Sequence, residues 1–255
     1  MDLKLQEKVF IVTGGASGIG EGISRALVAE GAIPIIVGRN EAKGDRLLQE
    51  LGTGHQIVIT LGSAESCRAV ADQAMSIAGR IDGLVNNAGA NDGVGLENGT
   101  PERWLQSLEN NLHHYYYLAH YLLPHLRESK GSILNVSSKT AVTGQGNTSA
   151  YAAAKGAQLA LTREWAVELL PYQIRVNALV PAEVMTPLYR SWLDSFEDPQ
   201  AKQRSIEEKI PLGQRMTTSE EMADMALFLL SERAAHITGQ QLYVDGGYVH
   251  LDRAL

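Results

Sequence analysis

A glycine-rich turn near the N-terminus constrains the fold more than any other feature. The turn, Thr13-Gly14-Gly15-Ala16-Ser17-Gly18-Ile19-Gly20, follows the β-prone run Val9-Phe10-Ile11-Val12 and opens a helical pattern. Glycines let the chain turn tightly and let a ligand approach the backbone closely. The free N–H groups at the start of a helix favour anions. A strand, a glycine turn and a helix in this order therefore indicate a dinucleotide pyrophosphate site.

β-prone runs alternate with helical patterns along the whole chain. The runs cover residues 9–12, 33–37, 56–60, 83–86, 132–136, 174–179 and 241–244, and the helical patterns cover 19–30, 41–50, 64–78, 101–127, 149–170, 190–209 and 219–230. Strands separated by helices form a parallel, doubly wound sheet with helices on both faces. A chain of 255 residues with 44% hydrophobic content can bury one large core. We expect a single α/β Rossmann domain over residues 1–255 with a seven-stranded sheet.

Composition argues against several other classes of protein. The lone Cys67 excludes an intrachain disulfide framework, and the first eight residues contain no apolar signal core. No apolar run approaches the roughly 20 residues of a membrane span. A net charge of -7 argues against nucleic acid or an anionic membrane as a partner. We expect a cytoplasmic protein.

Tyr151 and Lys155 form a candidate acid–base pair. They stand four residues apart in an alanine-rich helical stretch, so they share a helix face. A free phenol has a pKa of about 10, and a neighbouring cation favours the phenolate. Ser138, which follows a predicted strand, can hydrogen-bond a developing alkoxide. Alone, the pair would be typical of a half-buried aromatic beside a solvated charge, but the glycine turn favours the catalytic interpretation.

Taken together, these motifs resemble the classical short-chain dehydrogenase/reductase family from about Lys8 to Tyr248. They occur in the family's order: Thr13 to Gly20, Asn86-Asn87-Ala88-Gly89, Asn111, Ser138, Tyr151 with Lys155, Pro181 to Thr186, and Asp245-Gly246-Gly247 in a tail that runs to Leu255. The resemblance implies an NAD(P)-dependent oxidoreductase, usually a tetramer. It also implies that the proline-interrupted segment at about 187–212 is a mobile lid over the substrate.

The resemblance assigns roles to individual residues. Tyr151 would be the general base in the oxidative direction, and Lys155 would lower its pKa and bind the nicotinamide ribose. Ser138 would steady the reacting oxygen, with Ser137 as the less favoured alternative. Asn111, rather than Asn110, would bend a helix and relay protons through water. The expected cofactor-binding residues are Gly14, Ser17, Gly18, Ile19, Gly20, Arg39, Asn87, Ala88, Gly89, Tyr151, Lys155, Pro181, Val184 and Thr186.

The end of the second predicted strand bears on the choice of cofactor. Users of NAD generally carry an acidic residue there for the ribose hydroxyls, whereas an arginine suits a 2′-phosphate. This chain has Gly38 followed by Arg39. We expect NADP, with NAD possible if Arg39 only covers the adenine ring.

Polar residues dominate the positions that we expect to border the nicotinamide, namely Asn91, Asp92, Lys139, Gln145, Asn147 and Glu183. A hydroxyl-rich substrate needs paired donors and acceptors, while steroid or long acyl substrates need apolar walls. The loops after Ser138 and Pro181 and the C-terminal tail resemble bacterial L-fucose dehydrogenases, which implies oxidation of an aldose at C1 to a lactone. The expected substrate-binding residues are Ser138, Gln145, Asn147, Tyr151 and Glu183.

Two other functions remain open at this point. A 3-oxoacyl carrier-protein reductase would share every catalytic residue, and a dinucleotide-sensing protein would share the cofactor site without catalysing a reaction. We expect no metal site, because His113, His120 and the Tyr115-Tyr116-Tyr117 run on one predicted helix fit a subunit interface better than a metal site.

Overall fold

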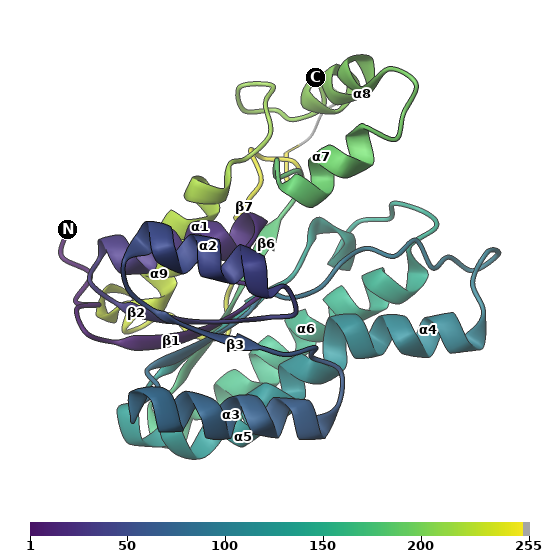
Figure 1. Cartoon of the computed structure of the whole chain (residues 1–255). Coiled ribbons are helices and arrows are strands. Elements are labelled where there is room, and N and C mark those ends of the chain that lie inside the picture. Colours follow the sequence, from purple (N-terminus) through teal and green to yellow (C-terminus); the bar gives the residue numbers. More distant parts are fainter. Residues whose placement is uncertain (252–255) are drawn as a thin grey trace.

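Seven parallel strands form one sheet in the order β3-β2-β1-β4-β5-β6-β7 in the computed structural model, which describes residues 1–251 (Figure 1). The last four residues of the C-terminal motif, 252–255, lie outside the described residues. The strands are β1 (Val9–Thr13), β2 (Ile33–Gly38), β3 (His55–Val58), β4 (Gly83–Asn86), β5 (Ser132–Val136), β6 (Arg175–Pro181) and β7 (Gln241–Val244). The order reverses between β1 and β4, where such sheets bind their ligands. The predicted doubly wound Rossmann fold is confirmed.

Helices cover both faces of the sheet (Figure 1). One face packs against α1 and α9, and the other packs against α3, α5 and the C-terminal half of α6. The helices are α1 (Gly18–Ala29), α2 (Glu41–Leu51), α3 (Ala64–Ala78), α4 (Pro101–Leu108), α5 (His114–Ser129), α6 (Ser149–Glu168), α7 (Pro187–Leu193), α8 (Pro199–Glu207) and α9 (Ser219–Leu230). Short 3-10 turns lie at Lys139–Ala141, Leu170–Tyr172 and Glu232–Ala234. The central strands are buried on both faces, which explains their continuous apolar runs.

The prediction of one helix over 101–127 was wrong. A π-helical turn, η1 (Glu109–His113), separates α4 from α5. Such a turn holds one extra residue, which a 3.6-residue apolar period does not reveal. Asn111 lies in the turn; its side-chain amide donates to Ser107 O at 3.0 Å and its Oδ1 accepts from Ala90 N at 2.8 Å. The turn therefore places Asn111 against the loop that follows β4.

The predicted helical pattern over 190–209, which prolines divide into two short amphipathic stretches, forms the two short helices α7 and α8. Pro199 begins α8, and the Asp198 side chain caps it by accepting from Ala201 N at 2.8 Å. The buried side chains of Leu193, Ile210 and Met216 give this part a small core of its own. In Figure 1 both helices project beyond the sheet.

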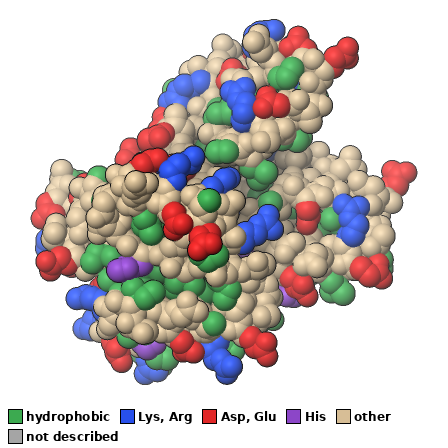
Figure 2. All heavy atoms as spheres, viewed as in Figure 1, with side chains coloured by type: hydrophobic (Ala, Val, Ile, Leu, Met, Phe, Trp, Pro, Cys, Tyr) green, Lys and Arg blue, Asp and Glu red, His purple; other side chains and the backbone are tan. Residues whose placement is uncertain are grey.

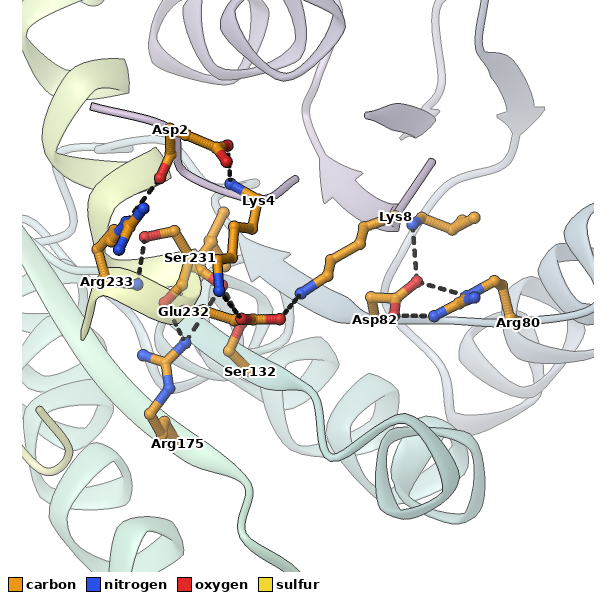
Figure 3. Close-up of polar contacts among 12 residues, drawn as sticks. Asp2, Lys4, Lys8, Arg80, Asp82, Ser132, Arg175, Ser231, Glu232 and Arg233 are labelled. Carbon is orange, nitrogen blue, oxygen red and sulfur yellow. Dashed lines mark hydrogen bonds and ion pairs between the residues drawn. The ribbon is translucent and has the colours of Figure 1, made fainter. Parts of the chain in front are cut away.

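Polar contacts close the opposite edge of the sheet, where the strands begin (Figure 3). The buried carboxylate of Asp82 accepts from Val9 N at 2.9 Å and from Arg80 at 2.6 and 2.9 Å. Arg175, at the start of β6, donates to the last two carbonyl groups of α9, at Leu229 and Leu230, and to that of Ser231, which follows the helix. These contacts pair backbone groups at strand and helix ends, so this edge is structural and the chemistry belongs to the carboxyl edge.

Candidate active site

Thr13, the last residue of β1, connects two of the predicted cofactor loops. Its hydroxyl donates to Val85 O at 3.2 Å and accepts from Asn87 N at 2.8 Å and from Ala88 N at 2.9 Å. The Asn87 amide returns a bond to Thr13 O at 2.8 Å. Thr13 was not among the predicted site residues, although a threonine that ends a strand at a glycine turn is a recognisable signal. It fixes the loop after β4 against the glycine turn.

The glycine turn has the backbone conformation and close packing that the motif predicts. Gly14 and Gly18 have φ angles of +65° and +57°, which residues with side chains rarely adopt. A Cβ at Gly20 would lie 2.3 Å from Gly14 O, and one at Gly18 would lie 3.1 Å from the Thr186 Cγ2 methyl. The glycine turn therefore packs against the segment that follows β6. Ser17 directly precedes α1, and Ile19 is the second residue of that helix.

The start of α1 fits a dinucleotide pyrophosphate. Ser17 occupies the N-cap position with an extended backbone, and its hydroxyl makes no capping bond to the helix. The first N–H groups of α1 are thus available to an anion, at the positive end of the helix dipole. Beyond β2, Arg39 is exposed, and a Cβ at Gly38 would meet no described atom within 4 Å. The edge beside Gly38 is open to a ribose or a phosphate.

Ser138 and Tyr151 face each other across the candidate reaction centre. A hydrogen bond from the Ser138 side chain lowers the pKa of Tyr151, but burial is the larger effect and raises that pKa to about 12. Ser137 instead donates to Lys155 O at 2.9 Å and so holds α6 in place. Asn110 is exposed while Asn111 is fully buried. The structure therefore favours Ser138 and Asn111 over their neighbours.

Lys155 lies beside Tyr151, but its ammonium is directed toward other groups. Its Nζ donates to Val136 O at 2.8 Å, to Gln158 Oε1 at 3.2 Å and to the Tyr115 hydroxyl at 3.5 Å. It lies 5.5 Å from the centre of the Tyr151 ring. Burial lowers the pKa of Lys155 to about 7. The ammonium is directed toward these acceptors rather than the phenol, and burial is the largest influence on both pKa values.

Gln158 is a site residue that the sequence interpretation missed. Its side chain is fully buried, and its Nε2 donates to Asn111 O at 2.6 Å while its Oε1 accepts from Lys155. Gln158 thus joins Lys155 on α6 to the π-turn. The available signal was a glutamine three residues after Lys155, on the same helix face.

His114 lies directly after the π-turn and was not predicted as a site residue. Its ring nitrogens lie 3.4 Å from Glu109 O and 3.2 Å from Ala88 O. Burial lowers its pKa to about 4, so the ring is neutral at pH 7. A neutral ring carries one N–H, so His114 donates to one of these two carbonyl groups, contacts the other, and adds no charge.

The predicted substrate residues fall into two groups. Glu183 is buried; its carboxylate forms an ion pair with Lys139 and accepts from the Tyr189 hydroxyl at 2.6 Å. Gln145 and Asn147 are exposed in the loop before α6. Figure 2 shows the hollow between the α7–α8 part and the part that carries α4. Pro181 ends β6, and Val184 is buried directly after Glu183.

Two features are absent from the described part of the chain. Within residues 1–251, no three His, Cys, Asp or Glu side chains are grouped so that they could hold a metal ion. None of the helices in that range is both long and apolar enough to cross a membrane.

On α5, His120 stacks on the exposed Tyr116 ring with 5.9 Å between ring centres.

Comparisons with known proteins agree with this geometry. A family model described as "Enoyl-(Acyl carrier protein) reductase" matches residues 14–249. L-fucose dehydrogenase of Oryctolagus cuniculus is 39% identical over 94% of this chain and 84% of that protein. The crystal structure of Cj0485 dehydrogenase is 48% identical with a TM-score of 0.96, over 100% of this chain and 99% of that one. Aldohexose dehydrogenase of Thermoplasma acidophilum, solved in ligand-free form, is 31% identical with a TM-score of 0.90, over the same shares.

Three features of the site fit NAD(P), the cofactor that short-chain dehydrogenases/reductases use. They are the free N–H groups at the start of α1, the glycine turn before it, and the open edge beside Gly38. The comparisons identify an oxidoreductase rather than a protein that only senses a dinucleotide. The chain belongs to the short-chain dehydrogenase/reductase family of oxidoreductases.

Proposed function

We propose that this enzyme oxidises C1 of an aldose, L-fucose or a stereochemically related sugar, to the corresponding lactone. The observation that carries the proposal is the similarity, over nearly the whole chain, to proteins named L-fucose dehydrogenase and aldohexose dehydrogenase. The buried charges beside Ser138 support it, because a hydroxyl-rich substrate needs paired polar groups.

In this mechanism Tyr151 takes the proton of the C1 hydroxyl as the C1 hydride leaves. Ser138 donates a hydrogen bond to the same oxygen and so fixes its position next to the phenol. Lys155, charged, favours the phenolate form of Tyr151. When bound, NAD(P) supplies the hydride acceptor. The residues that would hold it are Gly14, Ser17, Gly18, Ile19, Gly20, Arg39, Asn87, Ala88, Gly89, Tyr151, Lys155, Pro181, Val184 and Thr186.

The position of Asn111 modifies the proposed proton relay. Asn111 O accepts from Gln158 Nε2 at 2.6 Å, and Gln158 also contacts Lys155. A carbonyl oxygen has two lone pairs, so a water could bond the second. We propose that Asn111 and Gln158 together hold Lys155, while protons leave through water at the remaining lone pair.

NADP is the preferred cofactor in this proposal. Arg39 is exposed directly after β2, and the neighbouring Gly38 leaves space for a 2′-phosphate and carries no acid to bind ribose hydroxyls. An arginine suits a phosphate because its planar donors match the phosphate oxygens. NAD would bind the same turn without the 2′-phosphate contact.

The remaining proposals concern the surroundings of the site. Glu183, Gln145 and Asn147 would bind sugar hydroxyls, with α7 and α8, in the segment at about 187–212, acting as a lid over the sugar. The aromatic face of α5 would lie between subunits of a homotetramer, because interfaces are enriched in aromatic residues. The protein would act in the cytoplasm.

A second candidate, a 3-oxoacyl thioester reductase, is supported by the similarity to a 3-oxoacyl-[acyl-carrier-protein] reductase of Thermotoga maritima, which is 32% identical over 97% of this chain. A panel of aldoses with NADP and NAD, run beside acetoacetyl thioesters, separates the two. Oxidation of L-fucose, L-galactose or D-arabinose in preference to simple secondary alcohols is the expected result. Reduction of acetoacetyl thioesters without any reaction of free sugars would establish the second candidate instead.

A further inference from the structure

A buried ion pair joins the carboxyl ends of β5 and β6 beside Ser138. Lys139 follows Ser138 directly, and the side chains of Lys139 and Glu183 are only 11% and 10% exposed. Val136 of β5 pairs with Leu179 of β6, so both segments leave the sheet at the same edge. Such a pair adds little stability over apolar residues of similar volume. Its place next to the reacting centre points to a role in binding.

Two aromatic side chains fix the pair from other parts of the chain. The Tyr189 hydroxyl, on α7, donates to Glu183 Oε2 at 2.6 Å. The Lys139 ammonium lies 4.2 Å from the centre of the Tyr248 ring in the C-terminal segment. Burial and the Glu183 charge raise the pKa of Tyr189, so its hydroxyl remains a donor. The loops after β5 and β6, the α7 helix and the C-terminal segment therefore meet at this ion pair.

The pair is chemically complementary to a hydroxyl group. A carboxylate has about four acceptor sites and an ammonium has three donors. Glu183 receives bonds from Lys139 and Tyr189, which leaves acceptor sites next to the Lys139 donors. A hydroxyl can donate to the carboxylate and accept from the ammonium at once. A ketone or thioester oxygen only accepts, so it cannot donate to the remaining acceptor sites of the carboxylate.

We propose that Lys139 and Glu183 together form a recognition site for the hydroxyls of the sugar ring, with Lys139 as a specificity-determining residue. Lys139 holds the Glu183 carboxylate in place and supplies the donor that completes each hydroxyl contact. Tyr189 connects α7 to the same carboxylate, so Glu183 would contact both the sugar and the lid. This inference rests on the proposed oxidation of an aldose, which it deepens.

The test compares two substrates with the same reacting group. L-Fucose and tetrahydropyran-2-ol are both cyclic hemiacetals, but the second has no other ring hydroxyls. The variants are Lys139→Met, Glu183→Gln, the double variant and Lys139→Arg, and Arg68→Met, which removes an exposed cation from α3, is the matched control. For each variant, kcat and KM are measured with both substrates, and folding is checked by circular dichroism.

The ratio of kcat/KM for L-fucose to kcat/KM for tetrahydropyran-2-ol is expected to fall at least about tenfold in Lys139→Met and in Glu183→Gln, mainly through the KM of L-fucose. The double variant should lose little more than either single variant, because each breaks the same unit. Lys139→Arg should keep most of the ratio, and Arg68→Met should keep all of it.

Two results would overturn the inference and are distinguishable. If the wild-type enzyme oxidises L-fucose but Glu183→Gln and Lys139→Met keep the ratio within about twofold, the pair is structural and the sugar reaction stands. If the wild-type enzyme oxidises no aldose, the proposed function fails and this inference fails with it. Should Lys139→Met not fold, Glu183→Gln alone decides, since it keeps the size of the side chain.

Discussion

Replacing Gln158 with leucine tests the buried connection between α6 and the π-turn. Gln158 is fully buried, donates to Asn111 O at 2.6 Å and accepts from Lys155 Nζ at 3.2 Å. Leucine has a similar volume but neither a donor nor an acceptor. The variant therefore removes two hydrogen bonds without opening a large cavity.

The expected loss of stability in Gln158→Leu follows from the two hydrogen bonds that the variant removes. A neutral hydrogen bond contributes about 0.5–1.5 kcal/mol and one to a charged group about 1.5–3 kcal/mol. We expect the free energy of unfolding to fall by about 2–4 kcal/mol, because Asn111 O also stays buried without this donor. At about 2–4 °C for each kcal/mol, Tm should fall by about 5–15 °C.

Catalysis should change in a way that depends on pH. Burial already lowers the pKa of Lys155 to about 7, and the loss of an acceptor for its charged form should lower that pKa further. A neutral Lys155 no longer favours the Tyr151 phenolate. The turnover of Gln158→Leu should therefore fall by about tenfold above pH 7, one pKa unit of effect, and approach the wild-type value well below pH 7.

Urea titration measures the loss of stability, and a pH profile of sugar oxidation measures the loss of turnover. Gln73→Leu, which changes an exposed glutamine on α3, is the matched control and should leave both unchanged. An unfolding free energy within about 1 kcal/mol of wild type, together with an unaltered pH profile, would refute the role assigned to Gln158.

Four further predictions concern single residues. Tyr151→Phe should fold normally but turn over at least about 10²-fold more slowly, and near-normal turnover would remove Tyr151 from the mechanism. In wild type, oxidation should accelerate as pH rises above 7, because the Tyr151 pKa is about 12; Ser138→Ala should move this rise to higher pH, and an unmoved profile would contradict it. Arg39→Ala should weaken NADP by about 1.5–3 kcal/mol more than NAD, as measured by cofactor titration, whereas equal losses would mean that Arg39 only stacks on adenine. Burial lowers the His114 pKa from 6.5 to about 4, so the unfolded state binds a proton that the folded state does not, and stability should be lost as pH falls through this range. That loss, about 3 kcal/mol, should disappear in His114→Gln but persist in His55→Gln, an exposed control.

The strands and the glycine turn could be predicted because their signals are local. A buried parallel strand is a continuous apolar run, and each predicted run coincides with an observed strand to within two residues. The π-turn at Asn111 could not be found this way. It adds one residue to a helix whose apolar period continues on both sides, and its stabilising contacts come from Ala90 and Gln158, which are distant in the sequence.

The site was predictable in its residue types but not in its pairings. The motifs identified Ser138, Tyr151 and Lys155, and the structure gathers them at the carboxyl edge. The helical spacing of Tyr151 and Lys155 did not predict which acceptors the ammonium would choose, because Val136 O and Gln158 are presented by the fold. The Lys139–Glu183 pair likewise depends on the register of β5 against β6.

L-Fucose labelled with deuterium at C1 tests the central claim most directly. The sugar is incubated with the wild-type enzyme and with NADP or NAD, and the products are examined by mass spectrometry. We expect the deuterium in the reduced nicotinamide, the sugar as its lactone, and faster turnover with NADP. No reduction of either cofactor by the labelled sugar or by other aldoses, with acetoacetyl thioesters reduced under the same conditions, would contradict the account.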